Sequence, residues 1–513
     1  MTARIPLFAI LFLCAAVAAD ALEDPALEDQ ALQDQRPNVI LMFADDLGYG
    51  DLGSYGAQDI ATPNLDTLAA GGQRWTDFYV AAPVCSPSRG ALLTGRLPVR
   101  TGLYGRQIRV LFPGDSEGMP HSEVTLAEVL RDAGYQTAIV GKWHLGDASH
   151  RLPTRHGFDE WFGIPYSNDM DWADGVSFDE ALRMRAAGRG DEVTALYAAR
   201  YQRYFDPRLE FWNVPLMRSR RIGPSFEDSV VERPTDQRTL TRRYTEEAVR
   251  IIERAEKPFF LYMPYTMPHT PIFRSEAFAG RSARGRYGDV IEEIDWSVGE
   301  VIKTLKKQGI ERDTLVVFTS DNGPWLTMRE HGGSASPLRH GKGTTFEGGV
   351  RVPAIFSWPG TVEPAVIEAI GMAADLFTTI AKLAGGTLPD DREIDGVDLS
   401  RTLLRGEPSP RRWLAYYRAG ELTAFRSGDY KIHFVTEGAY GDPPPRQQHD
   451  EPLLYNLRED PGEQIEISAA HPGVVARLVR EAERHKASIT LAEPIFDQRL
   501  ATLVITNDQK GGH

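Results

Sequence analysis

One cysteine, Cys85, stands in the run CSPSR, which ends at Arg89. A helix beginning there would place the thiol and the guanidinium on one face, because residues four apart lie about one turn from each other. The chain has one other cysteine, Cys14, in an apolar N-terminal run of the kind removed on export. The mature protein would then carry a single thiol with no internal disulfide partner. Such a thiol is either buried as a small apolar residue or used chemically, and Cys85 alone does not decide between the two.

Carboxylates and an amide stand at the ends of two apolar runs. Asp45 and Asp46 follow the first run, and Asp321 and Asn322 follow a later one. Such oxygen ligands suit Ca²⁺ or Mg²⁺, whereas zinc sites usually include His or Cys, and a cation would relieve the repulsion between the carboxylates. Calcium is favoured because its flexible coordination accepts a site built mostly from protein. Taken singly, the Asp pair would be a helix cap and the Asn-Gly pair a turn.

Four basic side chains lie in short motifs elsewhere in the chain. Lys142 and His144 share the segment GKWHLG, His269 stands in MPHTP, and Lys342 lies between glycines in GKG. Glycines allow a ligand to approach the backbone closely, and a lysine supplies a compact positive charge. Each motif has an ordinary alternative: a solvated pair, a loop histidine or a flexible surface loop. Their significance depends on whether the fold brings them together.

The elements between these motifs predict an α/β fold. Apolar runs of strand length alternate with amphipathic helices, which is the pattern of a largely parallel sheet covered by helices. The predicted strands are 38–44, 136–140, 258–263, 314–319 and 353–358, and the clearest helices are 125–133, 240–255 and 290–308. Ligands of open α/β sheets bind at the carboxyl ends of the strands. Both acidic pairs, Lys142 and His269 follow such strands, so we expect one shared site.

Changes in composition divide the chain into five segments. Residues 1–19 combine a positive charge, a short apolar run and small residues, as in a secretory signal peptide, and the acidic repeat of 20–36 is interpreted as a flexible tether. We expect a catalytic domain over 37–407, a small antiparallel C-terminal subdomain over 408–500, and a tail over 501–513. The subdomain should contain strands near 413–417, 422–426 and 430–434 and a helix over 472–489. The fold of 169–234 is unreadable, and one interpretation is a long excursion over the sheet edge.

Composition narrows the classes of partner and compartment. Of 513 residues, 42% are hydrophobic and 25% charged, and the formal net charge of −15 argues against a nucleic-acid partner. A local positive potential can still attract an anionic substrate. After the signal, no run reaches the roughly 20 apolar residues of a membrane span, so we expect a soluble, secreted or periplasmic protein without a transmembrane segment. The lack of disulfides and of Asn-X-Ser/Thr sites favours a bacterial periplasm, and oligomeric state is not indicated.

Taken together, these motifs resemble the type I sulfatase family. The family signature is matched by CSPSR, beginning at Cys85, and by LTGR at the family's spacing after it. The likeness runs from Pro37 to about residue 465 and includes PNVILMFADDLGYGDLGSYG, GKWHLG, GIPYSND, MPHTP, SDNGP and GKGTTFEGGVRVP. Details such as IPYS and YKIHF are most similar to the branch that holds arylsulfatase A and N-acetylgalactosamine-6-sulfatase.

The resemblance implies a calcium-dependent sulfatase with an alkaline-phosphatase-like fold. A separate maturation enzyme would convert Cys85 to formylglycine (3-oxoalanine), whose hydrate attacks a sulfate ester to give a covalent sulfo-enzyme intermediate. One Ca²⁺ would be bound by Asp45, Asp46, Asp321, Asn322 and the side chain at position 85. The residues implied to line the sulfate pocket are Arg89, Lys142, His144, Ser167, His269 and Lys342. Of these, His269 with Lys342 would protonate the leaving alcohol, and His144 would take the proton of the second hydroxyl.

Other functions remain open from the sequence. A formylglycine-dependent phosphodiesterase or phosphonate monoester hydrolase would need the same residues. A protein that binds sulfated glycans but has lost catalysis is a further alternative, although the complete residue set argues against it. A phosphatase with two zinc ions is disfavoured because the recognisable ligands suit one metal. The sequence does not indicate whether the natural substrate is an aryl, carbohydrate or lipid sulfate.

Overall fold

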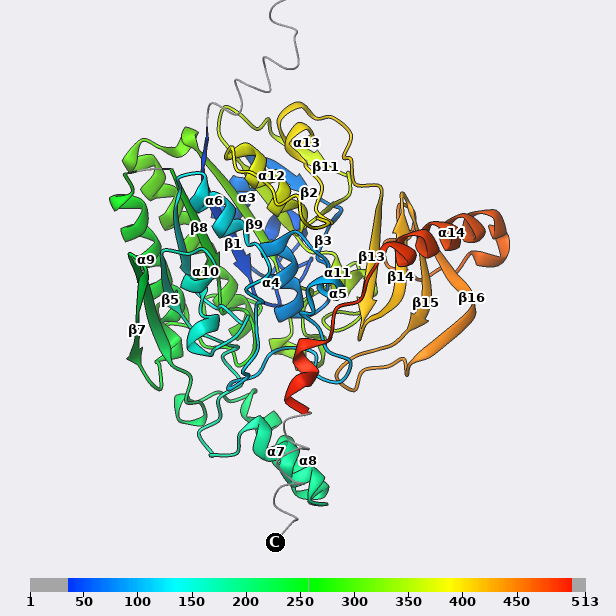
Figure 1. The fold of residues 1–513 in the computed structure, drawn as a ribbon, viewed down its shortest axis with the longest axis horizontal. Coiled ribbons are helices and arrows are strands. Elements are labelled where there is room, and N and C mark those ends of the chain that lie inside the picture. Colours follow the sequence, from blue (N-terminus) through cyan, green and yellow to red (C-terminus); the bar gives the residue numbers. More distant parts are fainter. Residues whose placement is uncertain (1–35, 257, 501–513) are drawn as a thin grey trace, which may run out of the picture.

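A computed structural model gives the structure of the chain over residues 36–256 and 258–500. The predicted signal peptide (1–19) and tail (501–513) lie outside the described residues, as does all of the predicted tether except Arg36. Figure 1 shows a large sheet between layers of helices, with a smaller sheet beside it that carries helix α14 (Pro472–Ser488). This architecture confirms the predicted fold class.

Within the described chain the large sheet has ten strands and is mixed. Its central strands are parallel and run, in spatial order, β9 (Thr314–Ser320), β1 (Asn38–Ala44), β8 (Phe259–Pro264), β4 (Gln136–Val140) and β5 (Glu160–Gly163). Beyond β9 lie β10 (Ala354–Ser357), β2 (Gln73–Trp75) and β11 (Ala365–Ile367), with β10 antiparallel to both of its neighbours. A separate short pair joins β3 (Phe78–Tyr79) to β12 (Gly371–Met372). All five strands predicted from the sequence are present, with ends within one residue of those expected.

Strand β1 shows why this sheet lies at the centre. Successive side chains of a strand point to opposite faces. In β1, Val39, Leu41 and Phe43 join the core on one side of the sheet, and Ile40 and Met42 join the core on the other. A strand buried on both faces needs an unbroken apolar sequence, which NVILMFA provides.

Helices cover both faces of the large sheet (Figure 1). One layer contains α3 (Pro63–Ala70), α9 (Leu240–Arg254) and α10 (Arg286–Gln308), and the other contains α4 (Cys85–Thr94), α6 (Leu126–Asp132) and α12 (Asp375–Leu383). Shorter helices are α5 (Pro98–Thr101), α11 (Glu347–Val350) and α13 (Ser400–Arg405). Helix α10 begins four residues before its predicted start, directly after Gly285, whose φ of 72° marks the change of chain direction.

The segment that could not be read from the sequence extends one edge of the large sheet. It forms helices α7 (Phe178–Ala186) and α8 (Gly190–Arg203), then the hairpin β6 (Leu216–Ile222) and β7 (Ser225–Glu232). Strand β6 pairs antiparallel with β5, so the hairpin continues the sheet rather than crossing over it. Almost all of β7 is exposed, which explains why its sequence lacks the apolar alternation of a half-buried strand.

The smaller sheet is antiparallel throughout. Its strands are β13 (Trp413–Arg418), β14 (Glu421–Ser427), β15 (Tyr430–Thr436) and β16 (Gln447–Asn456), in that order. Helix α14 packs on this sheet through β14 and β15. The sequence predicted the first three strands and the helix, but missed β16 because its first residues are polar and mostly exposed.

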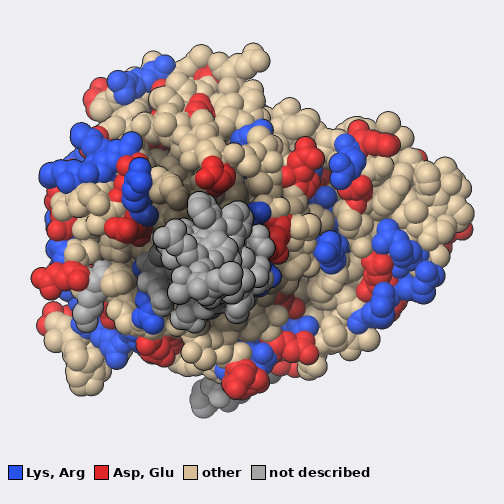
Figure 2. All heavy atoms as spheres, turned by 90° about the horizontal axis from the view of Figure 1, so that it is seen from above, with Lys and Arg blue, Asp and Glu red and all other residues tan. Residues whose placement is uncertain are grey.

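The charges on the surface are mixed. Figure 2 shows acidic and basic side chains interspersed over the face seen there, with wide areas of neither. Over residues 36–256 and 258–500, no helix combines the length and the apolar character needed to cross a bilayer.

Candidate active site

The carboxyl ends of the parallel strands meet at one buried site. Asp45 and Asp46 follow β1, Lys142 follows β4, His269 follows β8, and Asp321 follows β9. The other residues singled out from the sequence are brought to the same place and are also buried: Cys85, Arg89, His144, Ser167, Asn322 and Lys342. Residues from widely separated parts of the chain therefore form a single cluster.

Helix α4 supplies the thiol and the first cation. Cys85 is its first residue, and Arg89 lies about one turn further along. Cys85 is 2% exposed, with its Sγ 3.6 Å from Asp45 Oδ1. Burial raises the pKa of the Cys85 thiol well above its usual range, so the unmodified side chain would stay protonated and react poorly as a nucleophile. Arg89 donates from Nε and Nη2 to Asp321 Oδ2, at 3.1 and 2.8 Å.

Carboxylates and an amide form the anionic side of the site. The Asp46 N–H donates to Asp321 Oδ1 at 3.1 Å, and Asn322 Nδ2 donates to Asp46 Oδ1 at 2.7 Å. Burial raises the pKa of Asp46 and of Asp321, and the nearby Asp45 adds to the effect on Asp321. Holding these carboxylates ionised is therefore costly, and a cation would remove that cost.

The same residues fit a metal ion. Ligand atoms of Asp45, Asp46, Cys85 and His269 lie within 4.8 Å of one another. Asn322 Oδ1 is buried, and no described residue donates a hydrogen bond to it. An oxygen left without a donor beside several carboxylates is what an oxygen-ligated cation would satisfy. Asp321 is adjacent, but Arg89 already occupies its Oδ2.

Two lysines pair with these carboxylates. Lys142 Nζ lies 2.5 Å from Asp45 Oδ2 and 3.1 Å from Ser167 Oγ. Lys342 Nζ lies 2.7 Å from Asp46 Oδ2. Although burial acts to lower it, the charge of Asp46 raises the pKa of Lys342 well above its usual range, so this ammonium stays charged.

Positive and negative charges are matched in this cluster. The carboxylates of Asp45, Asp46 and Asp321 face the cations of Arg89, Lys142 and Lys342. Adding a divalent cation would leave the site positive. A buried positive pocket favours an anionic substrate, despite the negative charge of the whole chain.

The two histidines are neutral and differ in which nitrogen is free. His144 Nε2 lies 3.0 Å from the Leu111 carbonyl, which can only accept, so the proton is on Nε2 and the buried, unpartnered Nδ1 is a base. His269 Nδ1 donates to the Thr270 carbonyl at 2.5 Å, leaving Nε2 3.6 Å from Asp46 Oδ2. Burial, with the charge of the nearby lysines, lowers the pKa of both rings well below the usual range.

Two aromatic residues at this site were missed by the sequence reasoning. The Trp325 ring centroid lies 4.8 Å from Lys342 Nζ and 5.6 Å from the His269 ring. Tyr440, on the loop between β15 and β16, lies 4.8 Å from Trp325. Trp325 directly follows the strand-end motif SDNGP, which is a signal that could have identified it. Tyr440 lies in no motif, and only the fold brings it here.

Family models match nearly the whole described chain. The model described as Sulfatase matches residues 37–386, and the model for the C-terminal region of aryl-sulfatase matches residues 409–507. The chain belongs to the sulfatase family. This sulfatase is therefore an enzyme that hydrolyses sulfuric esters. The two matched regions correspond to the large and the small sheet.

Individual relatives agree with this assignment. The sulfatase is 44% identical to arylsulfatase A of Bos taurus over 84% of this chain and 83% of the relative. It is 38% identical to N-acetylgalactosamine-6-sulfatase of Mus musculus over 90% of this chain and 88% of the relative. Among solved structures, the PsFucS1 sulfatase from Pseudoalteromonas sp. matches with a TM-score of 0.76 and 31% identity, covering 89% of this chain and 91% of that chain. These relatives confirm the resemblance read from the motifs.

Proposed function

We propose that this sulfatase hydrolyses aryl or carbohydrate sulfate monoesters at the buried cluster around Cys85, with one Ca²⁺ and a formylglycine derived from Cys85. The observation that carries the proposal is the matched set of carboxylates and cations next to a deeply buried thiol, with Asn322 Oδ1 left without a donor. Burial raises the pKa of the Cys85 thiol, and a protonated thiol is a poor nucleophile, which supports a chemically converted side chain.

Two groups would complete the site. Asp45, Asp46, Asp321 and Asn322 would hold Ca²⁺, which when bound would stabilise negative charge on the ester oxygens. A separate maturation enzyme would supply formylglycine, whose hydrate offers one hydroxyl for attack on sulfur and a second whose ionisation releases sulfate.

The chain's own side chains orient the ester and move protons. Arg89, Lys142 and Lys342 bind the sulfate oxygens and balance the charge that develops on them. Ser167, which accepts a hydrogen bond from Lys142, fixes that ammonium. His269 and Lys342 would protonate the leaving oxygen, and the charged ammonium of Lys342 would supply the proton because Nε2 of the neutral His269 carries none. The unpartnered Nδ1 of His144 would accept the proton of the second hydroxyl once formylglycine is in place.

We also propose the domain limits and the location expected from the sequence. Residues 37–407 would be the catalytic domain and 408–500 the C-terminal subdomain, with support from the family matches, which break between residues 386 and 409. Tyr440 of the smaller unit reaches the site, so the two units act together. Export to the periplasm would depend on residues 1–19, which lie outside the described chain.

The test compares matched aryl sulfate and aryl phosphate esters with the purified, matured enzyme. We expect the sulfate to be turned over faster, and Cys85→Ala to abolish turnover of both. Mass spectrometry of the peptide spanning 82–89 should show the aldehyde in active enzyme. Faster turnover of the phosphate would assign a phosphodiesterase-like activity instead, and an unmodified thiol in active enzyme would contradict the mechanism.

A further inference from the structure

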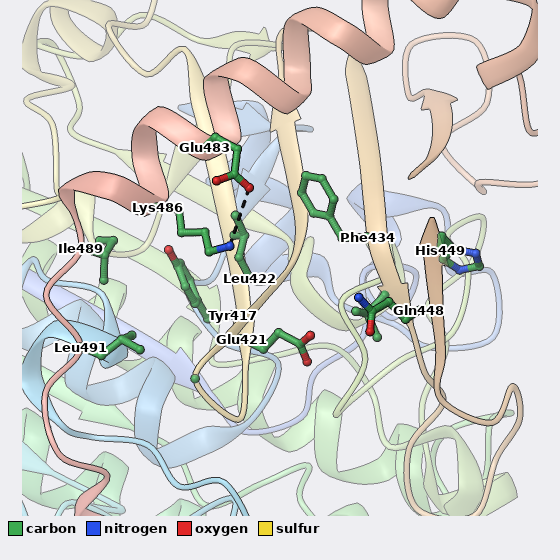
Figure 3. Close-up of a pocket in the computed structure, with 12 residues that line it drawn as sticks. Tyr417, Glu421, Leu422, Phe434, Gln448, His449, Glu483, Lys486, Ile489 and Leu491 are labelled. Carbon is green, nitrogen blue, oxygen red and sulfur yellow. Dashed lines mark ion pairs between the residues drawn. The ribbon is translucent and has the colours of Figure 1, made fainter. Parts of the chain in front are cut away.

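Two pockets flank the turn between β13 and β14, and both include Tyr417 and Gly420. The first lies between α14 and strands β14–β16 (Figure 3). Its polar lining includes Glu421 and Glu483, and Glu483 is paired with Lys486 at 3.7 Å. The wall of this pocket therefore carries charges of both signs.

The second pocket adjoins the active site and has a different character. It includes Val84 and Gly343, the chain neighbours of Cys85 and Lys342. Its charged lining consists of Arg109 and Arg418, without a lining carboxylate among the residues described. These two guanidinium groups give the pocket a positive lining, and an anion between them would relieve their mutual repulsion.

Arg109 lies at the surface beside Tyr440. Its side chain is exposed, and its guanidinium carbon lies 5.2 Å from the centroid of the Tyr440 ring. A Cβ placed on Gly343 would lie 3.4 Å from Arg109 Nη1, so Arg109 contacts the loop that carries Lys342. No carboxylate of residues 36–256 or 258–500 forms an ion pair with Arg109.

Residues of the same subdomain satisfy part of the hydrogen-bonding capacity of Arg418. Nη1 donates to the carbonyls of Glu437 and Gly438 at 3.2 and 3.0 Å and lies 3.3 Å from the Glu437 carboxylate. Nη2 is buried and has no hydrogen-bond partner among the described residues. Arg109 and Arg418 line the same pocket, and burial, followed by the charge of Arg109, lowers the pKa of Arg418.

A row of rings connects this pair of arginines to the catalytic cluster. Trp325 lies against Lys342 and His269, Tyr440 lies against Trp325, and Arg109 lies over Tyr440. Aromatic faces of this kind can hold the ring of a leaving group. In this row Tyr440 lies between Trp325 and Arg109.

We propose that Arg109 and Arg418, beside Tyr440, bind a second anionic group of the substrate. The substrate would be a sulfated saccharide that carries a carboxylate or a further sulfate on the leaving-group side of the ester that is cleaved. This inference rests on the proposed sulfatase function and specifies its substrate class.

The experiment compares kcat/KM for a monosulfated disaccharide with the values for its disulfated and its uronate-containing counterparts. The wild-type enzyme should prefer the substrates with a second anion, and added salt should reduce that preference. Arg109→Ala should lower the preference on the order of tenfold, the size of one charge-assisted contact near the surface. Arg109→Glu should lower it further, and Arg109→Lys should retain most of it. If the preference for one of the two second anions, sulfate or carboxylate, falls more in the Arg109 variants, that anion is the one that the subsite binds.

Arg106→Ala is the matched control, because Arg106 is an exposed arginine three residues earlier on the same loop. It should keep the wild-type preference. Binding of each disaccharide to Cys85→Ala and to Cys85→Ala/Arg109→Glu separates this inference from the proposed function, since it requires no turnover. Equal affinities for the two proteins, or equal preferences of wild type and Arg109→Glu, would overturn the subsite.

Discussion

Two ion clusters in this sulfatase contain the same number of charges but differ in the direction of their acids' pKa shifts and in whether a neighbouring oxygen lacks a hydrogen-bond donor. The catalytic cluster sets Asp45, Asp46 and Asp321 against Arg89, Lys142 and Lys342. The second cluster lies under the small sheet and sets Asp77, Glu347 and Glu463 against Arg351, Arg426 and Lys431. We call this second group the structural cluster.

The acids of the structural cluster are well supplied with donors. Glu347 accepts from the Tyr79 hydroxyl at 2.6 Å and from Lys431 at 2.8 Å. Glu463 accepts from His433 at 2.6 Å and from the Glu347 N–H at 2.7 Å. Although burial opposes it, the charge of Lys431 and these bonds lower the pKa of Glu463 to about 2.

The pKa shifts therefore point in opposite directions in the two clusters. Asp46 and Asp321 have raised pKa values, and the oxygen of Asn322 lacks a donor, whereas Glu463 is stabilised as an anion. A saturated cluster joins parts of the fold, while an unsaturated one can bind an ion and a substrate. Equivalent substitutions in the two clusters should therefore impair different properties: stability in the structural cluster and activity in the catalytic cluster.

The largest expected effect is on stability. Lys431→Met leaves Glu347 and Glu463 buried without their shared cation, and should lower the free energy of unfolding by about 3–5 kcal/mol. Denaturant unfolding measures this loss. Activity per folded molecule should be retained, and a variant that is stable yet inactive would contradict the structural role.

Lys342→Met makes the same substitution in the catalytic cluster. It removes a cation from the sulfate pocket, so kcat/KM for an aryl sulfate should fall by about 10²–10³. Steady-state kinetics in excess Ca²⁺ provide the measurement, and thermal unfolding under the same conditions is the control. If Lys342→Met lost as much stability as Lys431→Met and lost little activity, the two clusters would be equivalent.

Acid should weaken the structural cluster through Glu463. Its folded pKa, about 2, lies below its ordinary value of 4.5, so its stabilising contribution is present above about pH 4.5 and is lost as the pH falls towards 2. Urea unfolding across this range should show a steeper loss for wild type than for Glu463→Gln. Parallel curves would show that the carboxylate is not stabilised as an anion.

The smallest effect is expected outside both clusters. The Thr125 hydroxyl caps α6 by accepting from the Glu128 N–H at 3.2 Å, and the Glu128 carboxylate accepts from the Thr125 N–H at 2.8 Å. Thr125→Ala should cost about 1 kcal/mol of unfolding free energy and no activity per folded molecule. This loss is the reference for the two lysine variants. The loss of unfolding free energy in Lys431→Met, and the loss of kcat/KM in Lys342→Met expressed as a free energy, should each be several times larger.

The sequence predicted those parts of the fold whose local pattern and tertiary environment agree. The runs at β1 and β9 are apolar because both faces are buried, so strand type and position could be predicted from them. Strand β7 is held by pairing with β6 while its side chains face solvent, and β16 begins with polar residues. For these two strands, tertiary pairing determines the structure, and local composition gives no signal.

The active-site residues divide in the same way, into those placed by a local sequence pattern and those placed by tertiary packing. Asp45 and Asp321 directly follow recognisable strands and Lys142 comes two residues after one, so strand position alone brought them to one edge of the sheet. The pairing of Arg89 with Asp321 is a contact that spacing could not predict. Tyr440 was missed because it comes from another sheet, and its place depends on how the two sheets pack.

The contact between Glu463 and the catalytic loop also bears on the order of synthesis. The Glu347 N–H donates to the Glu463 carboxylate at 2.7 Å and Arg339 donates to its carbonyl at 2.9 Å, on either side of Lys342. Because a chain leaves the ribosome from its N-terminus, every candidate catalytic residue emerges before Glu463. A nascent chain halted short of that residue would contain the whole catalytic set, yet Lys342 would stand on a loop without these two anchors. Glu463 can therefore complete the support of the Lys342 loop only after every candidate catalytic residue has been synthesised.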